Sequence, residues 1–150
     1  MIDVRFVREE DISALEDLVR ICHPQRAIQD RRWWSVIPTL VVDGVVAYTQ
    51  FTLLPGGALF QCDLGVHPHA RGLGIGRALF AHRLRLARSF GAIYAVGSTA
   101  DSNVAMRRIF DAAGFTPGDM IQAEPEDERL YCGGVEAFTW AEAQMEKEYA

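Results

Sequence analysis

The stretch Leu64-Gly-Val-His-Pro-His-Ala-Arg-Gly-Leu-Gly-Ile-Gly-Arg77 decides the fold. It begins as a short apolar run typical of a strand, and Pro68 interrupts that run. Apolar residues then recur at helical spacing from Ile75 onward. Between the two lie three alternating glycines, Gly72, Gly74 and Gly76. The stretch therefore predicts a strand, a tight loop and the start of a helix.

A glycine loop that opens into a helix is suited to binding an anion. Glycines permit positive φ and remove the Cβ atoms that would keep a ligand away from the backbone. The unpaired N–H groups of the helix's first turn and the positive end of its dipole then point at the same place, and phosphate is the natural ligand there. Arg71 and Arg77 flank the turn and can add charge-assisted hydrogen bonds.

Spacing excludes two common phosphate loops. A P-loop needs Gly-Lys-Ser/Thr, whereas Gly76 is followed by Arg77 and Ala78. A dinucleotide fingerprint needs G-x-G-x-x-G and an acidic residue about 20 positions later, but the chain has no Asp or Glu between Asp63 and Asp101. A strand-to-helix turn without a ligand stays the plain alternative.

Length and composition indicate one soluble domain over residues 1–150. A chain of 150 residues can bury a single substantial core, and 49% hydrophobic with 23% charged residues is typical of globular proteins. No apolar run approaches the roughly 20 residues that cross a bilayer, and the N-terminus lacks the pattern of a signal peptide. We expect a cytoplasmic protein without membrane contact.

Cysteines and histidines do not indicate a metal site. Cys22, Cys62 and Cys132 are odd in number and include no close pair, so they favour neither a disulfide framework nor a cysteine-rich metal centre. His67 and His69 lie two residues apart, a spacing at which structural or surface histidines are the more common explanation. We expect no bound metal.

The net charge of −5 is unevenly distributed. Residues 64–100 carry five Arg and no acid, whereas residues 101–150 carry four basic and eleven acidic residues. A polyanionic ligand is therefore attracted to the glycine loop, and the acidic remainder argues against a nucleic-acid partner. For Arg83, Arg85 and Arg88 we expect the simpler role of a solvated helix face.

Hydrophobic periodicity places further elements around the loop. In chain order we expect a strand at 3–7, a helix from Ile12 to about His23, strands at 39–42 and 45–53 around an Asp43-Gly44 turn, a strand at 58–66, a helix at 75–90, a strand at 92–96 and a helix at 105–113 closed by Gly114. The strand, helix and strand at 58–96 make a right-handed βαβ crossover with parallel strands. The anion site then lies at the carboxyl end of the first of them.

Two segments are less clear. In 25–37, Trp33 and Trp34 cannot both face one side of a helix, so one packs inward and the other is free to line a pocket. After residue 117, Gly118–Gln122 and Arg129–Phe138 are candidate strands around an acidic connector, followed by a short helix over 140–149. The core thus covers about 2–138. The tail packs on this domain or on a second subunit, which leaves a homodimer open.

Two motifs resemble one known family. Arg71-x-x-Gly74-x-Gly76, preceded by Val66-x-Pro68, resembles the acetyl-CoA pyrophosphate loop of the GNAT N-acetyltransferase superfamily. The second motif, a helix that starts at an Asn and ends at Gly-Phe, resembles the other GNAT signature: Asn103-x-x-Met106-x-x-x-Phe110-x-x-x-Gly114-Phe115. Together with the N-terminal elements, the resemblance spans about residues 2–118.

The resemblance implies a fold and an activity. The fold is α+β in three α/β/α layers, with a mixed, mostly antiparallel sheet whose βαβ crossover holds the cofactor. The activity is transfer of acetyl from acetyl-CoA directly to an amine of an unidentified small molecule or peptide. The implied acetyl-CoA contacts are Leu64, Gly65, Val66, Arg71, Gly72, Leu73, Gly74, Ile75, Gly76, Arg77, Asn103 and Phe110. The Val66 N–H would be the oxyanion donor.

The chain departs from the family where many members carry the two proton-transfer residues. Phe110 stands where many members have a Tyr proposed to protonate the leaving thiolate, and Tyr94, Tyr131, Ser98 or a water are the possible substitutes. Many members also carry a Glu base on the strand before the loop. That strand offers Gln61, Cys62 and Asp63 instead, and Asp63 is our candidate base.

These departures leave two alternatives open. One is an acyl-CoA-binding or regulatory module that has lost catalysis, and the other is a transferase that uses another acyl donor such as a succinyl group. The acidic C-terminal third is compatible with a cationic acceptor, although a solvated acidic loop explains the same charges.

Overall fold

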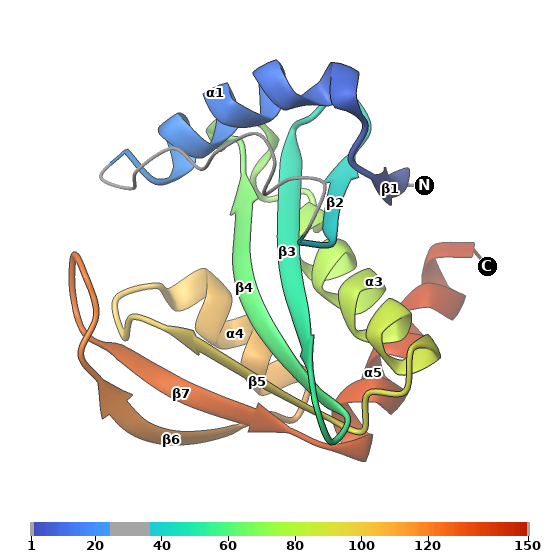
Figure 1. The fold of residues 1–150 in the computed structure, drawn as a ribbon. Coiled ribbons are helices and arrows are strands. Elements are labelled where there is room, and N and C mark those ends of the chain that lie inside the picture. Colours follow the sequence, from blue (N-terminus) through green and yellow to red (C-terminus); the bar gives the residue numbers. More distant parts are fainter. Residues whose placement is uncertain (1, 25–36, 150) are drawn as a thin grey trace.

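The computed structural model describes residues 2–24 and 37–149, which build one mixed sheet flanked by helices (Figure 1). The seven strands found in these residues lie in the order β1-β2-β3-β4-β5-β7-β6. β4 and β5 run parallel, and the other neighbouring strands of the described chain run antiparallel. The strands are β1 (Val4–Phe6), β2 (Thr39–Val42), β3 (Ala47–Leu54), β4 (Ala58–Val66), β5 (Tyr94–Thr99), β6 (Thr116–Ile121) and β7 (Glu128–Gly133). The helices are α1 (Ile12–Cys22), α3 (Ile75–Ser89), α4 (Val104–Ala112) and α5 (Val135–Tyr149), with short 3₁₀ turns at Glu9–Asp11 and Pro68–Ala70.

Helices cover both faces of the sheet. On one face, Leu15 and Val19 of α1 form a buried cluster with Val41 and Tyr48 of β2 and β3. α3, α4 and α5 lie on the opposite side of the sheet from α1 (Figure 1). Side chains of a strand alternate between faces, so Leu40, next to Val41, joins the opposite cluster. The predicted three-layer α+β fold with its parallel β4–β5 crossover is confirmed.

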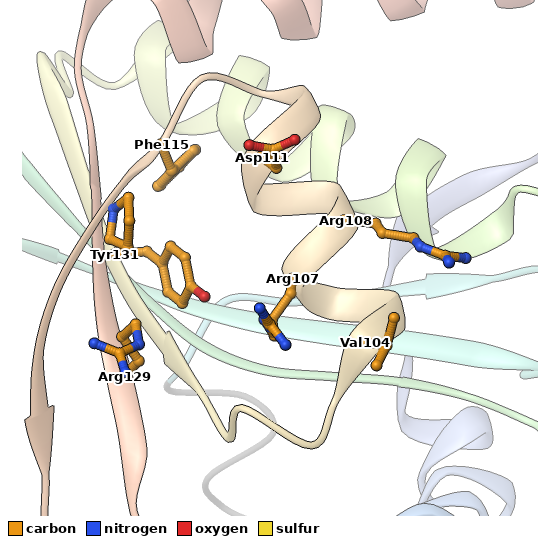
Figure 2. Close-up of a pocket in the computed structure, with 8 residues that line it drawn as sticks. Val104, Arg107, Arg108, Asp111, Phe115, Arg129 and Tyr131 are labelled. Atoms are coloured by element: carbon orange, nitrogen blue, oxygen red, sulfur yellow. The ribbon is translucent and has the colours of Figure 1, made fainter.

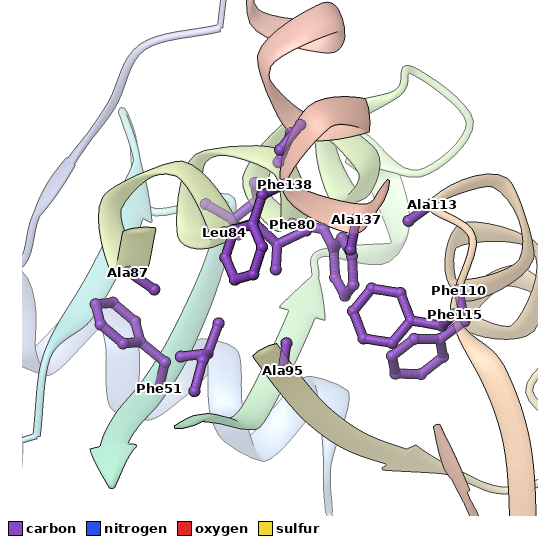
Figure 3. Packing of buried hydrophobic residues seen from close by; sticks show 14 of the residues in the cluster. Phe51, Phe80, Leu84, Ala87, Ala95, Phe110, Ala113, Phe115, Ala137 and Phe138 are labelled. Carbon is purple, nitrogen blue, oxygen red and sulfur yellow. The ribbon is translucent and has the colours of Figure 1, made fainter. Parts of the chain in front are cut away.

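The larger core lies between the sheet and α3, α4 and α5 (Figure 3). Its centre is aromatic, because the Phe80 ring meets the rings of Phe110, Phe115 and Trp140 at centroid distances of 5.5, 5.6 and 6.0 Å. Phe110 also stacks on Tyr131 of β7, with centroids 4.4 Å apart. Aromatic pairs of this kind contribute roughly 0.5–1.5 kcal/mol each beyond the burial of their area. The cluster therefore fixes α4 against α3, α5 and β7.

The C-terminal helix begins earlier than the sequence predicts. We expected a strand reaching Phe138 and a helix over 140–149, whereas α5 starts at Val135. β7 ends at Gly133, and the buried residues that follow recur at helical spacing: Ala137, Phe138, Ala141 and Met145. α5 packs against α3, so the tail completes the core of its own domain. The homodimer stays a prediction.

The loop between β2 and β3 is longer than predicted. The sequence indicates a two-residue turn at Asp43-Gly44, but the loop occupies residues 43–46. Gly44 and Val45 both adopt positive φ, 80° and 51°, and the Val45 N–H donates to the Val42 carbonyl at 2.8 Å. This closes a tight turn before the strand resumes, so β3 begins at Ala47.

The end of α3 also shifts a boundary. Ala92 was expected to open a strand, but its N–H donates to the Ala87 carbonyl at 3.1 Å and closes the helix. Gly91 supports this turn with a φ of 97°, and β5 begins at Tyr94. The prediction for Trp33 and Trp34 lies outside the described residues.

Arg83 is buried, so its predicted place on a solvated helix face is wrong. Only 1% of its surface is exposed, whereas Arg85 and Arg88 are exposed as expected. On α3 it shares the inward face with four core residues, Leu79, Phe80, Leu84 and Ala87. Residues three and four positions apart lie on the same side of a helix, so the Arg83 side chain points into the core with these neighbours.

Candidate active site

β4 and β5 pair at one end and diverge at the other (Figure 1). Their parallel ladder joins residues 58–60 to residues 94–96. Beyond it, the register of β4 against β3 shifts between Thr49 and Phe51, which marks a bulge. A bulge bends a strand and increases its twist. The sheet is therefore open at the carboxyl end of β4, where the sequence predicts the anion site.

The guanidinium of Arg83 lies beneath this bulge. Its Nη1 donates to Thr49 Oγ1 at 2.5 Å and to the carbonyls of Asp63 and Gln50 at 3.3 and 3.4 Å. Thr49 Oγ1 in turn donates to the Asp63 carbonyl at 2.6 Å. The Arg83 charge also lies 5.0 Å from the centroid of the Phe80 ring. These contacts give hydrogen bonds to backbone carbonyls at the place where the regular ladder is interrupted.

The last residues of β4 turn backbone groups toward the opening, where the Val66 carbonyl already accepts from Arg71 Nε at 3.0 Å. The His67 N–H donates to the Val46 carbonyl at 2.8 Å, so the backbone of His67 and, two residues earlier, of Gly65 faces β3. Backbone groups of successive residues point to alternate sides of a strand. The N–H and C=O of Leu64 and Val66 therefore face away from β3, toward the side from which β5 has diverged. An extended ligand can pair with them as a strand would.

The glycine loop after β4 has the backbone geometry that an anion site needs. Gly72 and Gly74 have φ values of 81° and 79°, a left-handed backbone conformation that residues other than glycine rarely adopt. Gly74 is the N-cap of α3 and has no side chain that could cap the helix. The N–H groups of the first helical turn can therefore donate to a ligand. Gly76 is helical instead. A Cβ there would lie 3.6 Å from Val66 Cγ2, an ordinary contact.

A cavity of about 450 Å³, the glycine-loop cavity, joins this loop to α4. It is lined by Cys22, His23, Leu64, Gly65, Val66, Ala70, Arg71, Gly72, Gly74, Ile75, Gly76, Arg77, Asn103, Ala105, Met106 and Ile109. Arg71 is held at its wall, since its Nε donates to the Val66 carbonyl at 3.0 Å. Asn103 caps α4 by accepting a hydrogen bond from the Met106 N–H at 3.2 Å. Leu73, 71% exposed, projects from the loop into solvent.

Two further side chains near the loop have structural explanations. The His67 and His69 rings stack with centroids 5.1 Å apart, and His67 Nδ1 accepts from the His69 N–H at 3.1 Å. The Cys22 thiol donates to the Val66 carbonyl at 3.5 Å, and burial raises its pKa although Arg71 opposes the shift. Cys22 is therefore a protonated thiol at neutral pH rather than an activated nucleophile.

A second cavity of about 500 Å³, the inter-strand cleft, fills the gap between the diverging strands. It is lined by His23, Phe60, Asp63, Leu64, Arg83, Gly97, Ser98, Thr99, Ala100, Ser102, Asn103, Met106, Phe110, Glu124, Pro125, Glu126 and Glu128. Four residues line both cavities: His23, Leu64, Asn103 and Met106. The two cavities therefore meet at the backbone of β4 and the first turn of α4.

The predicted proton-transfer residues are distributed unequally around this cleft. Asp63 and Ser98 line it, whereas Tyr94 pairs with Ala58 at the opposite end of β5. Phe110 lines the floor but is only 2% exposed, so it acts chiefly as a core residue. The structure thus leaves Asp63 and Ser98 as the sequence candidates that reach the cleft.

Tyr131 lines a different cavity, on the outer face of α4 (Figure 2). Its hydroxyl points toward Arg107 in this view, and its ring stacks on Phe110. Arg129 lies beside it and is held by Asp101, through hydrogen bonds of 3.0 and 3.1 Å that lower the pKa of Asp101. Tyr131 is therefore directed away from the inter-strand cleft and is a poor substitute for the missing acid.

Sequence reasoning missed two contributors to the cleft. Glu128 was placed only in an acidic connector, yet it begins β7 and accepts a hydrogen bond from Ser98 at 2.7 Å. Arg83 was assigned to a solvated face. Its burial has a sequence signal, the spacing from Leu79 and Ala87, whereas the Glu128 contact depends on strand pairing that no local pattern reveals.

The described residues contain neither a metal-binding group nor a membrane-spanning helix. No group of three or more His, Cys, Asp or Glu side chains in residues 2–24 and 37–149 is arranged to hold a metal ion. Within the same ranges, no helix has the length and apolarity needed to span a bilayer.

Fold and site together define an α+β protein with a splayed parallel strand pair, a glycine loop at a helix N-terminus and a capped helix opposite, a geometry suited to a ligand with phosphate groups. A model of the acetyltransferase (GNAT) family matches residues 6–115. The chain belongs to this family, and the resemblance in the sequence is confirmed.

Solved structures agree on the fold. The chain is similar to Arabidopsis thaliana NAA60 in complex with acetyl-CoA, with 15% identity, a TM-score of 0.77 and 90% of this chain and 99% of that chain covered. It is similar to a Bacillus subtilis acetyltransferase in complex with CoA, with 14% identity, a TM-score of 0.74 and 90% of this chain and 99% of that chain covered. It is also similar to the Escherichia coli ribosomal-protein-S18-alanine N-acetyltransferase, with 15% identity, a TM-score of 0.75 and 90% of this chain and 94% of that chain covered. No curated protein matches the chain.

Proposed function

We propose that the protein is an N-acetyltransferase that moves an acetyl group from acetyl-CoA directly to an amine of a small molecule or peptide. The observation that carries this proposal is the junction of the two cavities at Leu64, Asn103 and Met106. A donor in the glycine-loop cavity and an acceptor in the inter-strand cleft would present their reacting atoms to each other there. Such alignment makes attack effectively unimolecular.

The donor half fits the chemistry of acetyl-CoA. The first turn of α3, Arg71 and Arg77 supply N–H donors and positive charge for the diphosphate. The outward backbone of Leu64 and Val66 supplies partners for the amide groups of the pantetheine arm. The Val66 N–H is the donor we assign to the thioester oxygen, where negative charge develops as the amine attacks.

The acceptor half must remove a proton from an amine. An alkylamine is protonated at neutral pH, and its nitrogen attacks only after the ammonium loses a proton. Asp63 lines the cleft and remains the base that the sequence suggested. The leaving thiol has an ordinary pKa near 8.5, so its departure needs little help from an acid such as the absent tyrosine.

One observation favours a second candidate, an acyl-CoA-binding module without catalysis. Phe110 replaces the residue that many family members use as an acid, and it is buried in the aromatic core.

Location in the cytoplasm and a homodimer stay predictions of the sequence.

Two measurements on the purified chain decide between the candidates. Calorimetry with CoA tests the donor half, and we expect saturable binding. Thiol release from acetyl-CoA with a broad amine panel, with mass spectrometry of the products, tests transfer. Binding without acceptor-dependent thiol release on any amine supports the binding module. Succinyl-CoA as an alternative donor tests whether acetyl is the preferred group.

A further inference from the structure

Cleft hydroxyls orient two carboxylates of the inter-strand cleft, and one of these pairs is half-buried. Glu126 accepts a hydrogen bond from Ser102 Oγ at 2.6 Å, but both of these residues are exposed. Ser98 Oγ donates to Glu128 Oε1 at 2.7 Å, and both residues are half-buried in the cleft wall. A serine hydroxyl held this way fixes one carboxylate oxygen and leaves Oε2 to accept from a ligand.

Strand pairing puts this contact on the face of the sheet opposite α4. Ser98 pairs with Leu130 in the antiparallel β5–β7 ladder, so Glu128 is its diagonal neighbour on the same face. Tyr131 has the opposite parity and stacks on Phe110 of α4. Ser98 and Glu128 therefore point away from α4, and two paired strands hold them more rigidly than a loop would.

Asp63 lies across the opening from this pair. The side chains of Leu64 and Val66 face α3, because a Cβ at Gly76 would contact both at 3.6–3.7 Å. Asp63 precedes Leu64, at the bulge, and lines the cleft. The cleft thus has a β4 wall with Asp63 and a β5–β7 wall with Ser98 and Glu128.

The direction of attack selects between these walls. If the proposed function holds, the thioester carbonyl bonds to the backbone of β4, and the amine lone pair must point at that carbonyl carbon. Before attack the acceptor is an ammonium ion without a lone pair, and a proton directed to the wall opposite β4 lies on the side that carries Glu128. Once that proton is removed, the nitrogen turns its lone pair toward the carbonyl carbon. A base must be within hydrogen-bond reach of the proton that it removes.

We propose that Glu128 is the general base of this reaction and that Ser98 is the residue that positions its carboxylate. Glu128 Oε2 takes one proton from the ammonium group of the acceptor. The neutral nitrogen forms a bond to the acetyl carbonyl carbon, the carbon–sulfur bond breaks, and CoA leaves as a thiolate. The thiolate takes up the second proton that nitrogen loses, and Glu128 releases its proton to solvent. One ammonium and one acetyl-CoA give one amide, one CoA thiol and one proton.

The test uses the amine that the panel shows to turn over fastest. Glu128→Gln keeps the shape and the Ser98 contact but cannot take a proton. We expect kcat to fall at least about 100-fold at neutral pH, with CoA affinity unchanged by calorimetry. The loss should shrink as the pH rises toward about 10, because the acceptor is then increasingly unprotonated. Ser98→Ala should lose about tenfold, and Ser98→Thr, which keeps a hydroxyl, should recover most of it.

Other charged groups face the same space, and the controls separate their effects. They are His23 after α1, Asp63 on β4, Arg83 on α3, and Glu124 and Glu126 in the β6–β7 connector. Asp127→Asn removes a neighbouring charge outside the cleft lining and should match the parent. Glu126→Gln tests whether cleft carboxylates merely attract a cationic amine, since it should then raise KM as much as Glu128→Gln does.

The outcomes are distinguishable. Parent-like kcat in Glu128→Gln, a deficit that stays constant with pH, or equal KM effects in Glu126→Gln and Glu128→Gln overturn the assignment. A collapse of kcat in Asp63→Asn alone transfers the role to Asp63. A parent that binds CoA but acts on no amine overturns the proposed function, and this inference with it.

Discussion

The two cavities that meet at Leu64 are built from different parts of the chain. The glycine-loop cavity uses main-chain groups of one continuous stretch, 64–77, and needs its side chains chiefly to be small or positively charged. The inter-strand cleft uses side chains from several separate elements, including Asp63, Ser98 and Glu128. The comparison teaches that the half made of backbone carries a local sequence motif, whereas the half made of side chains depends on contacts between segments that are distant in the sequence.

The largest expected effect is in the backbone half. Gly74→Val forces a β-branched residue into a φ of 79° at the N-cap of α3 and places methyl groups in the anion site. We expect CoA affinity to fall about 100-fold, equivalent to about 2.7 kcal/mol, as measured by calorimetry.

A matched glycine controls for strain. Gly91 has a φ of 97° at the other end of α3, and no atom lies within 4 Å of a Cβ built there. Gly91→Val should lose comparable stability, about 1–2 kcal/mol, and keep its CoA affinity. Equal CoA affinities in Gly74→Val and Gly91→Val would contradict a role of the glycine loop in CoA binding.

The next test removes a buried side chain beneath the inter-strand cleft. Arg83→Met removes the donor to the Thr49 hydroxyl and one of the two donors to the Asp63 carbonyl, and urea unfolding should show a loss of about 2 kcal/mol. Arg85→Met is the control. Its exposed ion pair with Glu142, at 3.6 Å, should contribute less than about 0.5 kcal/mol. Similar losses in both variants would contradict the buried network.

A smaller effect is expected at the phosphate end of the glycine-loop cavity. Arg71→Gln removes one cation, and CoA affinity should fall about tenfold, or about 1.4 kcal/mol. The remaining affinity should also depend less on salt, because part of the attraction is electrostatic. Arg88→Gln, on an exposed part of α3 outside the cavity lining, should leave both properties as in the parent. Calorimetry at low and high salt checks both.

The smallest effect lies far from both cavities and sharpens the pH experiments. Arg5 donates to Asp11 at 2.6 and 2.9 Å and, as the main cause, lowers the pKa of that carboxyl from 3.8 to about 2. A lowered pKa gives stability that is present above about pH 4 and is lost as the pH falls toward 2. Asp11→Asn should therefore cost about 1 kcal/mol at pH 7, only a small part of that near pH 2, and nothing well below pH 2. A constant difference in urea unfolding across this range would contradict the ion pair.

The structure confirms those sequence predictions that depend on local geometry. Gly72 and Gly74 adopt positive φ, Asn103 caps α4 and Gly114 ends that region with a φ of 78°. Each of these depends on residues within one turn or loop. Arg83 was also predictable in principle, because its spacing on α3 matches that of core residues, but the charge itself led to the opposite prediction.

The errors and omissions concern contacts between distant segments. Glu128 meets Ser98 across 30 positions of sequence, and only the register of β5 against β7 makes them neighbours. Phe138 was expected in a strand, but it lies in α5. The helix is stabilised by its packing on α3, a contact between segments that are distant in the sequence. Short-range patterns do not contain this information.

By itself, the sequence determined the strand, glycine loop and helix from Leu64 onward, the crossover that follows, and through them the family and the anion-binding half of the site. These features depend on φ preferences and helix periodicity, which act between residues close in the chain. The tertiary structure alone decided that Arg83 enters the core beneath the bulge and that Ser98 and Glu128 share a wall facing Asp63. Burial and strand register bring together residues whose separation in sequence carries no signal of their contact.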